Sequence, residues 1–400
     1  MDYKEKYIKK IGITLVLVAG IVFFLFIYVK KSTPEAQTNI ISTGTTSVKD
    51  KSIPNVDPTR PSAIIQPEII ATGLKIPWDL AFLPDQGLLV TERAGNLVHI
   101  EKDGNVTSIS LPHPVPKGEG GLLGIVLHPN FATNRFLYLY MTTQNDIGGT
   151  KNAVFRYRYE NKKLTNEEVV ISGIPGAIYH DGGRMEFGPD GFLYITTGDA
   201  QTPAIAQNLN SLGGKILRVT DDGDVPTDNP FGTAVYSYGH RNPQGLAWDD
   251  EGRLWGTEHG RSGITSGMDE INLIEKGKNY GWPDIEGTKS KDGMETPVEN
   301  SGPNETWAPA SLVFLNGSLF FGGLLGESLY EAVITGDHTH EKGHVDIHAF
   351  NSYFKNDYGR IRTVRVGPDG MLYLTTSNRD GRGKPITEDD RIIRIDPRGL

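Results

Sequence analysis

The sequence predicts an all-β protein, a six-bladed β-propeller with an N-terminal transmembrane helix and a flexible linker. One observation for the propeller is a short phrase, a polar turn followed by a strand of Leu, aromatic and β-branched residues, which recurs six times. A second is that the segments between these copies are short and contain Asp-Gly turns, with no helical pattern of comparable strength. A long uncharged run near the N-terminus predicts the transmembrane helix.

The repeat fixes the number of blades. Its clearest copies are GPDGFLYITT, beginning at Gly188, and GPDGMLYLTT, beginning at Gly367. The central leucines of the six copies are Leu89, Leu137, Leu193, Leu254, Leu319 and Leu372. A second apolar strand follows each copy, at 96–100, 153–159, 215–219, 270–274, 328–333 and 391–395. Four-stranded sheets arranged radially leave only short edges exposed, so we expect six such blades. Residues 67–70 would supply the strand that closes the last blade against the first.

The N-terminal segment predicts a membrane anchor at residues 1–31. Ile11 to Val29 is a run of 19 residues without a charge, long enough to cross the hydrocarbon core. More lysines precede the run than follow it, which keeps the N-terminus, a short tip, in the cytoplasm. No small-residue cleavage pattern follows, which favours an uncleaved anchor over a cleaved signal peptide or a buried core helix.

The rest of the chain divides into two parts. Residues 32–66 are rich in Ser, Thr, Pro and Asn and predict an extracytoplasmic linker. Residues 67–400 would then form the propeller as an extracytoplasmic catalytic domain tethered to the membrane.

Composition excludes some classes of function. The net charge is −9, and no long basic run appears after residue 31, so a nucleic-acid partner is not expected. The chain has no cysteine, which excludes disulfides and thiolate metal sites.

Function in a propeller lies where loops converge on the central channel. One such loop is YHDGGR, residues 179–184, in which paired glycines follow His180. A histidine on a loop can accept a proton from an alcohol, although a satisfied surface or core histidine is the alternative. Asp199 closes the following strand and is placed to fix the tautomer of that imidazole.

Three further phrases carry candidate residues. GHRNPQG, residues 239–245, sets Arg241 beside Asn242, either as fixed donors for a ligand or as groups that satisfy loop carbonyls. EHGR, DEIN and KNYGWP, between residues 258 and 283, supply carboxylates and loop carbonyls, the ligands that Ca²⁺ prefers. In GRIR, residues 359–362, alternation places two arginines on one strand face, where they suit a polyanion such as a tricarboxylate.

In this order the phrases HDGGR, GPDG, TTGDA, GHRNPQG, DEINLI, GKNYGWP and GRIR resemble a known family. They are similar to the soluble aldose and glucose/sorbosone dehydrogenases that use pyrroloquinoline quinone (PQQ), and the resemblance covers roughly residues 67 to 397. GHRNPQG followed by DEINLI and NYGWP is the specific part of the set, whereas GPDG alone is a common turn. GEGGLLGIVLHPNF, residues 118–131, resembles the second blade of the same family.

The resemblance implies the oxidation of aldose sugars to lactones with PQQ and Ca²⁺ as cofactors. His180, as general base, would remove the proton of the anomeric hydroxyl while a hydride moves to the Ca²⁺-bound quinone. Ca²⁺ and Arg241 would stabilise the oxyanion that develops. Electrons would pass on to a membrane acceptor that the sequence does not identify.

The resemblance also assigns residues. Catalytic roles fall to His180, Asp199 and Arg241. Contacts with the cofactor fall to Glu119, His180, Arg241, Asn242, Thr306, Arg360 and Arg362. The carbonyls of Gly260 and Arg261 match the Ca²⁺ that chelates PQQ, and Glu270 and Tyr280 match a second, structural Ca²⁺.

Three positions depart from the family pattern. Leu325 stands where the glucose enzyme has a lysine that contacts the quinone, and Glu119 stands where the family often has Gln. Tyr179 replaces an acidic residue beside the base. Loss of a lysine and gain of a carboxylate both disfavour anion binding, unless Glu119 is turned away.

Other functions stay open at this point. A Ca²⁺-dependent lactonase-type hydrolase would use carboxylates rather than the pair Arg360 and Arg362. A non-catalytic sugar-binding propeller is a third possibility. A cluster of histidines at 338, 340, 344 and 348 is a candidate transition-metal site.

Overall fold

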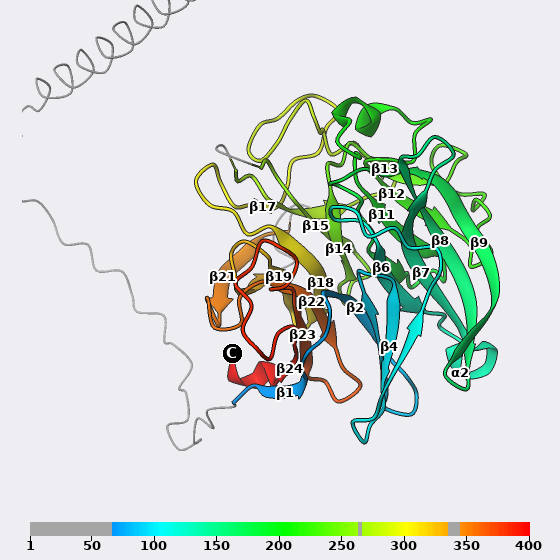
Figure 1. The fold of residues 1–400 in the computed structure, drawn as a ribbon. Coiled ribbons are helices and arrows are strands. Elements are labelled where there is room, and N and C mark those ends of the chain that lie inside the picture. The colour runs from blue at the N-terminus through cyan, green and yellow to red at the C-terminus, as the bar shows by residue number, and fades with distance from the viewer. Residues whose placement is uncertain (1–65, 263–265, 335–344) are drawn as a thin grey trace, which may run out of the picture. The chain divides into compact units, whose positions relative to one another are not determined.

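The computed structural model of the chain describes residues 66–262, 266–334 and 345–400, and these residues form six four-stranded antiparallel sheets (Figure 1). Three short helices lie between or after the strands: α2 (Phe131–Asn134), η1 (Pro203–Gln207) and η2 (Pro397–Gly399).

Five of the sheets consist of four strands that are consecutive in the sequence. The first blade contains β2 (Pro77–Phe82), β3 (Leu88–Glu92), β4 (Asn96–Ile100) and β5 (Val106–Ser110), and the second contains β6 (Leu122–Leu127), β7 (Phe136–Gln144), β8 (Thr150–Glu160) and β9 (Lys163–Pro175). The third blade contains β10 (Met185–Phe187), β11 (Leu193–Thr197), β12 (Lys215–Val219) and β13 (Val235–Tyr238), and the fourth contains β14 (Pro243–Trp248), β15 (Leu254–Glu258), β16 (Glu270–Ile274) and β17 (Glu299–Asn300). The fifth blade contains β18 (Pro309–Leu315), β19 (Ser318–Gly323), β20 (Leu329–Ile334) and β21 (Ile347–Tyr353).

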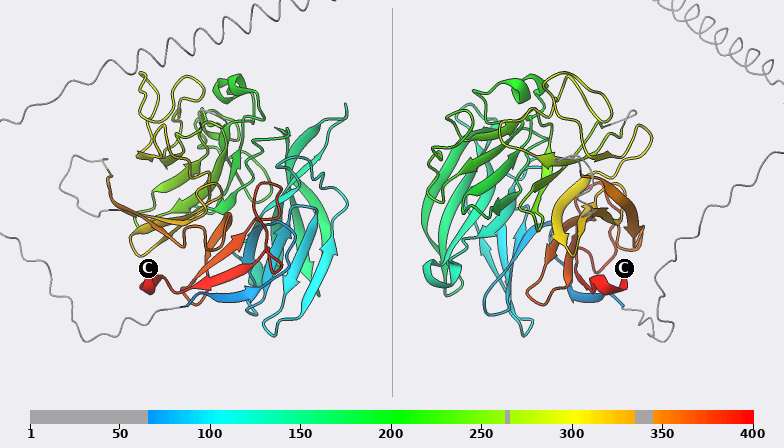
Figure 2. Two further views of the ribbon diagram at one scale, coloured as in Figure 1. Left: turned by 60° about the vertical axis from the view of Figure 1, so that its left-hand side comes forward. Right: turned by 180° about the vertical axis from the view of Figure 1, so that it is seen from behind.

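The sixth sheet closes the ring. Its strands β22 (Ile361–Val366), β23 (Leu372–Thr376) and β24 (Ile392–Ile395) pair in order, and β1 (Glu68–Ala71) adds to β24 in antiparallel register. The first strands of neighbouring blades contact each other in the order β2, β6, β10, β14, β18, β22 and back to β2. In two further views the strands from the two ends of the propeller domain lie together (Figure 2). The six blades and the closing strand predicted from the repeat are confirmed.

The repeated phrase corresponds to the second strand of each blade. Leu89, Leu137, Leu193, Leu319 and Leu372 are fully buried, and Leu254 nearly so, because the faces of adjacent blades pack against one another. One such cluster joins Tyr140 and Val154 of the second blade to Ile195 and Leu217 of the third. Burial on both faces explains why these strands read as nearly continuous apolar runs.

Blade topology determines which loops meet at the channel. Because strands within a blade alternate in direction, the loop after the second strand and the connection to the next blade emerge at the same end. Except for Tyr280, which lies in the long loop between β16 and β17, the predicted site residues lie on loops of these two kinds or at the strand ends beside them. The opposite end carries the tight turns, including both GPDG turns.

The predicted transmembrane helix and linker lie outside the described residues, as do three of the four clustered histidines. Within the described ranges no helix is long and apolar enough to cross a membrane.

Candidate active site

A cavity of about 480 Å³ opens at this loop-bearing end of the channel. Many of the predicted site residues line it, together with several side chains that the sequence did not single out. The predicted residues among the lining are Glu119, His180, Arg241, Gly260, Arg261, Thr306 and Arg360.

His180 and Asp199 form a hydrogen-bonded pair in this cavity. Asp199 is fully buried, and its Oδ1 lies 2.7 Å from Nδ1 of His180. The backbone of His180 is left-handed, with φ of 65°, a conformation rare for a residue with a side chain. The glycine at position 198 leaves room for this backbone conformation, because a Cβ on Gly198 would lie only 2.0 Å from the carbonyl oxygen of His180. When Nδ1 donates to Asp199, Nε2 of His180 is free to accept a proton.

Arg241 is buried beside this pair, and Asn242 lies behind it. The guanidinium of Arg241 donates to the His259 carbonyl at 3.3 Å and to Ser262 Oγ at 3.2 Å. Arg241 therefore does satisfy a loop carbonyl, while it also lines the cavity. Asn242 is not part of the lining; its Oδ1 accepts from the Gly182 amide and so supports the His180 loop.

The two arginines of GRIR differ in their partners. Arg360 lines the cavity and forms an ion pair with buried Asp380, with Nη2 2.8 Å from Oδ2. Arg362 is buried but does not line the cavity; its Nη1 donates to the neutral Gln244 at 2.6 Å. Its Nε has no hydrogen-bond partner among the described residues, and burial lowers the pKa of Arg362 to about 9. Arg362 is thus a buried cation to which no carboxylate in the described ranges is bound.

Glu119 is turned toward a cation that the sequence did not reveal. Its Oε1 accepts from Arg382 Nη1 at 2.8 Å, and its Oε2 accepts from the His180 amide. Burial opposes ionisation of Glu119, but the charge and hydrogen bond of Arg382 and the hydrogen bond from the His180 amide outweigh it and lower its pKa. Arg382 also lies over the Tyr179 ring, 5.3 Å from its centroid. The negative charge of Glu119 is therefore compensated within the site.

Asp269 joins the loop of Gly260 to the loop of Thr306. Its Oδ1 accepts from the Gly260 amide at 2.8 Å, and its Oδ2 accepts from Thr306 Oγ1 and from the amides of Trp307 and Ala308. The predicted Ca²⁺ ligands, the carbonyls of Gly260 and Arg261, thus belong to a loop held by a buried carboxylate.

Glu270 and Tyr280, the residues predicted for a second Ca²⁺, line a separate small void of about 10 Å³ with Glu258 and Glu286. Burial and the nearby Glu258 charge raise the pKa of Glu270 to about 8, as expected for buried carboxylates that lie close together. The Tyr280 hydroxyl donates to the Leu273 carbonyl at 2.6 Å, so its side chain is already engaged. Among the described residues no three His, Cys, Asp or Glu side chains are arranged to hold a metal ion.

Sequence reasoning gave no role to His259, Asp269, Asp380 or Arg382. His259 lines the cavity, and its Nε2 is buried without a partner among the described residues. Burial lowers the pKa of His259 to about 4, which keeps it neutral. His259 and Asp269 lie inside the phrases EHGR and DEIN, so their position within these motifs could have indicated that they belong to the site. Asp380 and Arg382 lay outside every motif.

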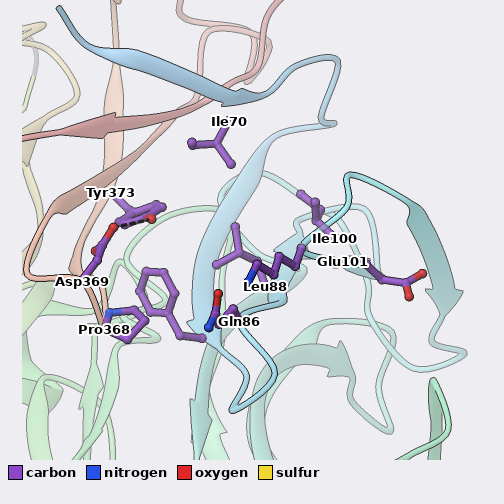
Figure 3. Close-up of a pocket in the computed structure, with 10 residues that line it drawn as sticks. Ile70, Gln86, Leu88, Ile100, Glu101, Pro368, Asp369 and Tyr373 are labelled. Atoms are coloured by element: carbon purple, nitrogen blue, oxygen red, sulfur yellow. Dashed lines mark hydrogen bonds between the residues drawn. The ribbon is translucent and has the colours of Figure 1, made fainter.

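A second cleft, of about 380 Å³, lies at the opposite end of the blades between β2–β4 and β22–β23 (Figure 3). Its floor is apolar, with Ile70, Leu88 and Tyr373, and Glu101 and Asp369 stand at its edge. None of the predicted catalytic or cofactor-binding residues lines it.

Comparisons with known proteins agree with this fold. The family model for glucose / sorbosone dehydrogenase matches residues 74–392. The aldose sugar dehydrogenase YliI of Escherichia coli K12 is 34% identical over 370 residues, covering 84% of this chain and 94% of that protein. Quinoprotein glucose dehydrogenase B of Acinetobacter calcoaceticus is 35% identical over 276 residues, covering 60% of this chain and 56% of that protein.

A solved structure, the PQQ-bound form of aldose sugar dehydrogenase from Streptomyces coelicolor, is 40% identical to this chain. It superposes with a TM-score of 0.75 and covers 82% of this chain and 96% of its own. Motifs, six-bladed fold and relatives agree: the chain belongs to the glucose/sorbosone dehydrogenase family.

Proposed function

We propose that this protein oxidises aldose sugars to lactones with PQQ and Ca²⁺. The observation that carries the proposal is the presence, at one end of the channel, of a carboxylate-oriented histidine together with a buried arginine that no carboxylate of the described residues binds. Within the described part of the chain, His259 Nε2 and Arg362 Nε are buried without hydrogen-bond partners, and a ligand rich in oxygen atoms would satisfy them. The residues present therefore fit a polyanionic quinone.

The cofactor would be held mainly by cations. Arg362 offers a charge that no carboxylate of the described residues binds directly, while Arg360 keeps Asp380 as a partner and can still present its remaining N–H groups. Arg241, Thr306 and Glu119, which line the cavity, complete the proposed cofactor contacts, and Asn242 would join them only through its buried Nδ2, which has no partner among the described residues. The carbonyls of Gly260 and Arg261 would bind the Ca²⁺ that accompanies it, and Glu270 with Tyr280 would hold a second Ca²⁺.

Bound PQQ would supply the hydride acceptor for the reaction. The protein's part begins at His180, whose Nε2 takes the proton of the anomeric hydroxyl while Asp199 holds Nδ1. Because the buried carboxyl group of Asp199 lies beside the ring and accepts from Nδ1, the imidazolium that forms is stabilised as it appears. The buried Arg241 guanidinium provides positive charge where negative charge develops.

The alternatives fit less well. A metal-dependent lactonase needs several carboxylate or imidazole ligands at the channel, and the described residues contain no such group of three. A binding propeller gives no reason for a buried carboxylate at hydrogen-bond distance from a cavity histidine.

Replacement of the base tests the proposal. His180→Ala should lower turnover about a hundred- to ten-thousand-fold while PQQ affinity and thermal stability change little. A loss of folding in this variant, or unchanged turnover, would contradict the role of His180.

We also propose that the uncharged run at 11–29 anchors the protein with its propeller outside the cytoplasm. Protease added to intact cells should then release a soluble fragment that begins within residues 32–66. Protection of the propeller until the membrane is permeabilised would show the opposite orientation.

A further inference from the structure

Trp282 lies in the loop between β16 and β17 and contacts two groups of the proposed catalytic machinery. Its indole Nε1 donates to Asp199 Oδ2 at 2.8 Å, while the other carboxylate oxygen, Oδ1, meets His180. The Arg241 guanidinium lies over its ring, 5.4 Å from the centroid. One side chain from the fourth blade therefore contacts the partner of the base and the neighbouring cation.

The indole is the only partner of Asp199 Oδ2 among the described residues. Oδ1 has two donors, His180 Nδ1 and the Gln201 amide at 2.9 Å. Asp199 is fully buried, so water cannot replace a lost donor without rearrangement. Without the indole N–H, Oδ2 is left unsatisfied and the carboxylate is free to rotate away from the imidazole.

Trp282 is itself held firmly in place. Its amide donates to the Gly239 carbonyl at 2.8 Å, and its carbonyl accepts from Gln207 Nε2 at 2.7 Å. The Gln207 side chain in turn exchanges two hydrogen bonds with the Asn279 amide group. The backbone on both sides of the indole is thus anchored to other loops of the third and fourth blades.

We propose that Trp282 is a positioning residue that fixes the orientation of the Asp199–His180 pair and keeps Arg241 beside it. The inference rests on the proposed dehydrogenase function. The indole N–H sets the plane of the carboxylate, the carboxylate sets the imidazole, and the ring face holds the guanidinium through a cation–π contact. Errors of about 1 Å in such an arrangement cost about a hundred-fold in rate.

Trp282→Phe in the full-length protein removes the N–H donor but keeps an aromatic face for Arg241. With PQQ and Ca²⁺ we expect kcat to fall about 10- to 100-fold, with KM and PQQ affinity changing less than about threefold. Trp282→Leu, which also removes the ring face, should lower kcat further. Trp248→Phe is the matched control, since Trp248 packs against Tyr194 away from the cavity and should leave kcat unchanged.

A second readout needs neither cofactor nor turnover. In the cofactor-free protein, labelled with ¹⁵N-histidine, the Nδ1 proton of His180 should give a downfield NMR signal that is absent in His180→Gln. We expect Trp282→Phe to shift or broaden this signal and Trp248→Phe to preserve it. A signal unchanged in Trp282→Phe, or a parallel loss of melting temperature, PQQ affinity and kcat, would overturn the positioning role. If wild-type protein shows no PQQ-dependent turnover, the proposed function fails, and the NMR comparison still decides the role of Trp282.

Discussion

Arg362 gives a prediction in which stability and cofactor affinity move in opposite directions. Burial lowers its pKa to about 9 from an ordinary value of 12.5. Each pKa unit corresponds to about 1.4 kcal/mol, so the buried charge of Arg362 lowers the free energy of unfolding by at most about 5 kcal/mol. This cost is the same at pH 7 as at any other pH below about 9, because Arg362 is charged throughout that range. Arg362→Met removes that cost but also removes the hydrogen bond to Gln244, which offsets about 1–3 kcal/mol.

We therefore expect cofactor-free Arg362→Met to be more stable than wild type by about 1–3 kcal/mol. Its affinity for PQQ should fall, because a charge-assisted contact with a carboxylate contributes about 1.5–3 kcal/mol, roughly a factor of 10 to 150. Urea unfolding followed by tryptophan fluorescence measures the first quantity, and calorimetric titration with PQQ measures the second.

Arg360→Met, two residues earlier in the chain, is the matched control. Its removal leaves the carboxylate of Asp380 buried without its guanidinium, so this variant should be less stable by about 3 kcal/mol. If Arg362→Met were destabilised to the same extent and kept full affinity for PQQ, Arg362 would be a structural residue, and the reasoning from its missing partner would be refuted.

Two further predictions concern ion pairs of the channel. Burial alone would raise the pKa of Asp79, but the charges of Arg184 and Arg365 lower this pKa below 3.8. The stability that the Asp79 carboxylate contributes is therefore present above about pH 4 and is lost as the pH falls through the folded-state pKa. Asp79→Asn should cost about 3–5 kcal/mol in urea unfolding at pH 7 and progressively less in acid; a pH-independent difference would contradict the ionic origin. Arg382→Leu should weaken PQQ binding about tenfold, because it leaves the charge of Glu119 uncompensated. Adding Glu119→Gln to the same chain should restore the affinity for PQQ. An affinity that stays low in the double variant would contradict the electrostatic account.

The fold could be predicted from the sequence because each blade carries a local signal. The six leucines of the repeat all occupy the second strand of a blade and are buried there. A turn followed by an apolar strand depends only on neighbouring residues, and a fixed repeat then determines the ring. The closing strand followed from the same reasoning, since the last blade had only three strands of its own.

The partners of the site residues could be predicted only in part. His180 and Asp199 are 19 residues apart and flank one short blade strand pair, so their contact follows from local order. Glu119 and Arg382 are separated by 263 positions and meet only because the ring closes. Trp282 reaches Asp199 across 83 positions because the third and fourth blades are neighbours. Contacts between blades depend on ring geometry, which no single motif encodes.

The central claim is that this propeller is built to use PQQ, and reconstitution tests it most directly. Protein produced without PQQ should be inactive and should gain aldose-dependent dye reduction when PQQ and Ca²⁺ are added together. PQQ should also raise its melting temperature in proportion to the logarithm of the excess over Kd. Protein that neither binds PQQ in the presence of Ca²⁺ nor reduces the dye with any aldose would contradict the claim.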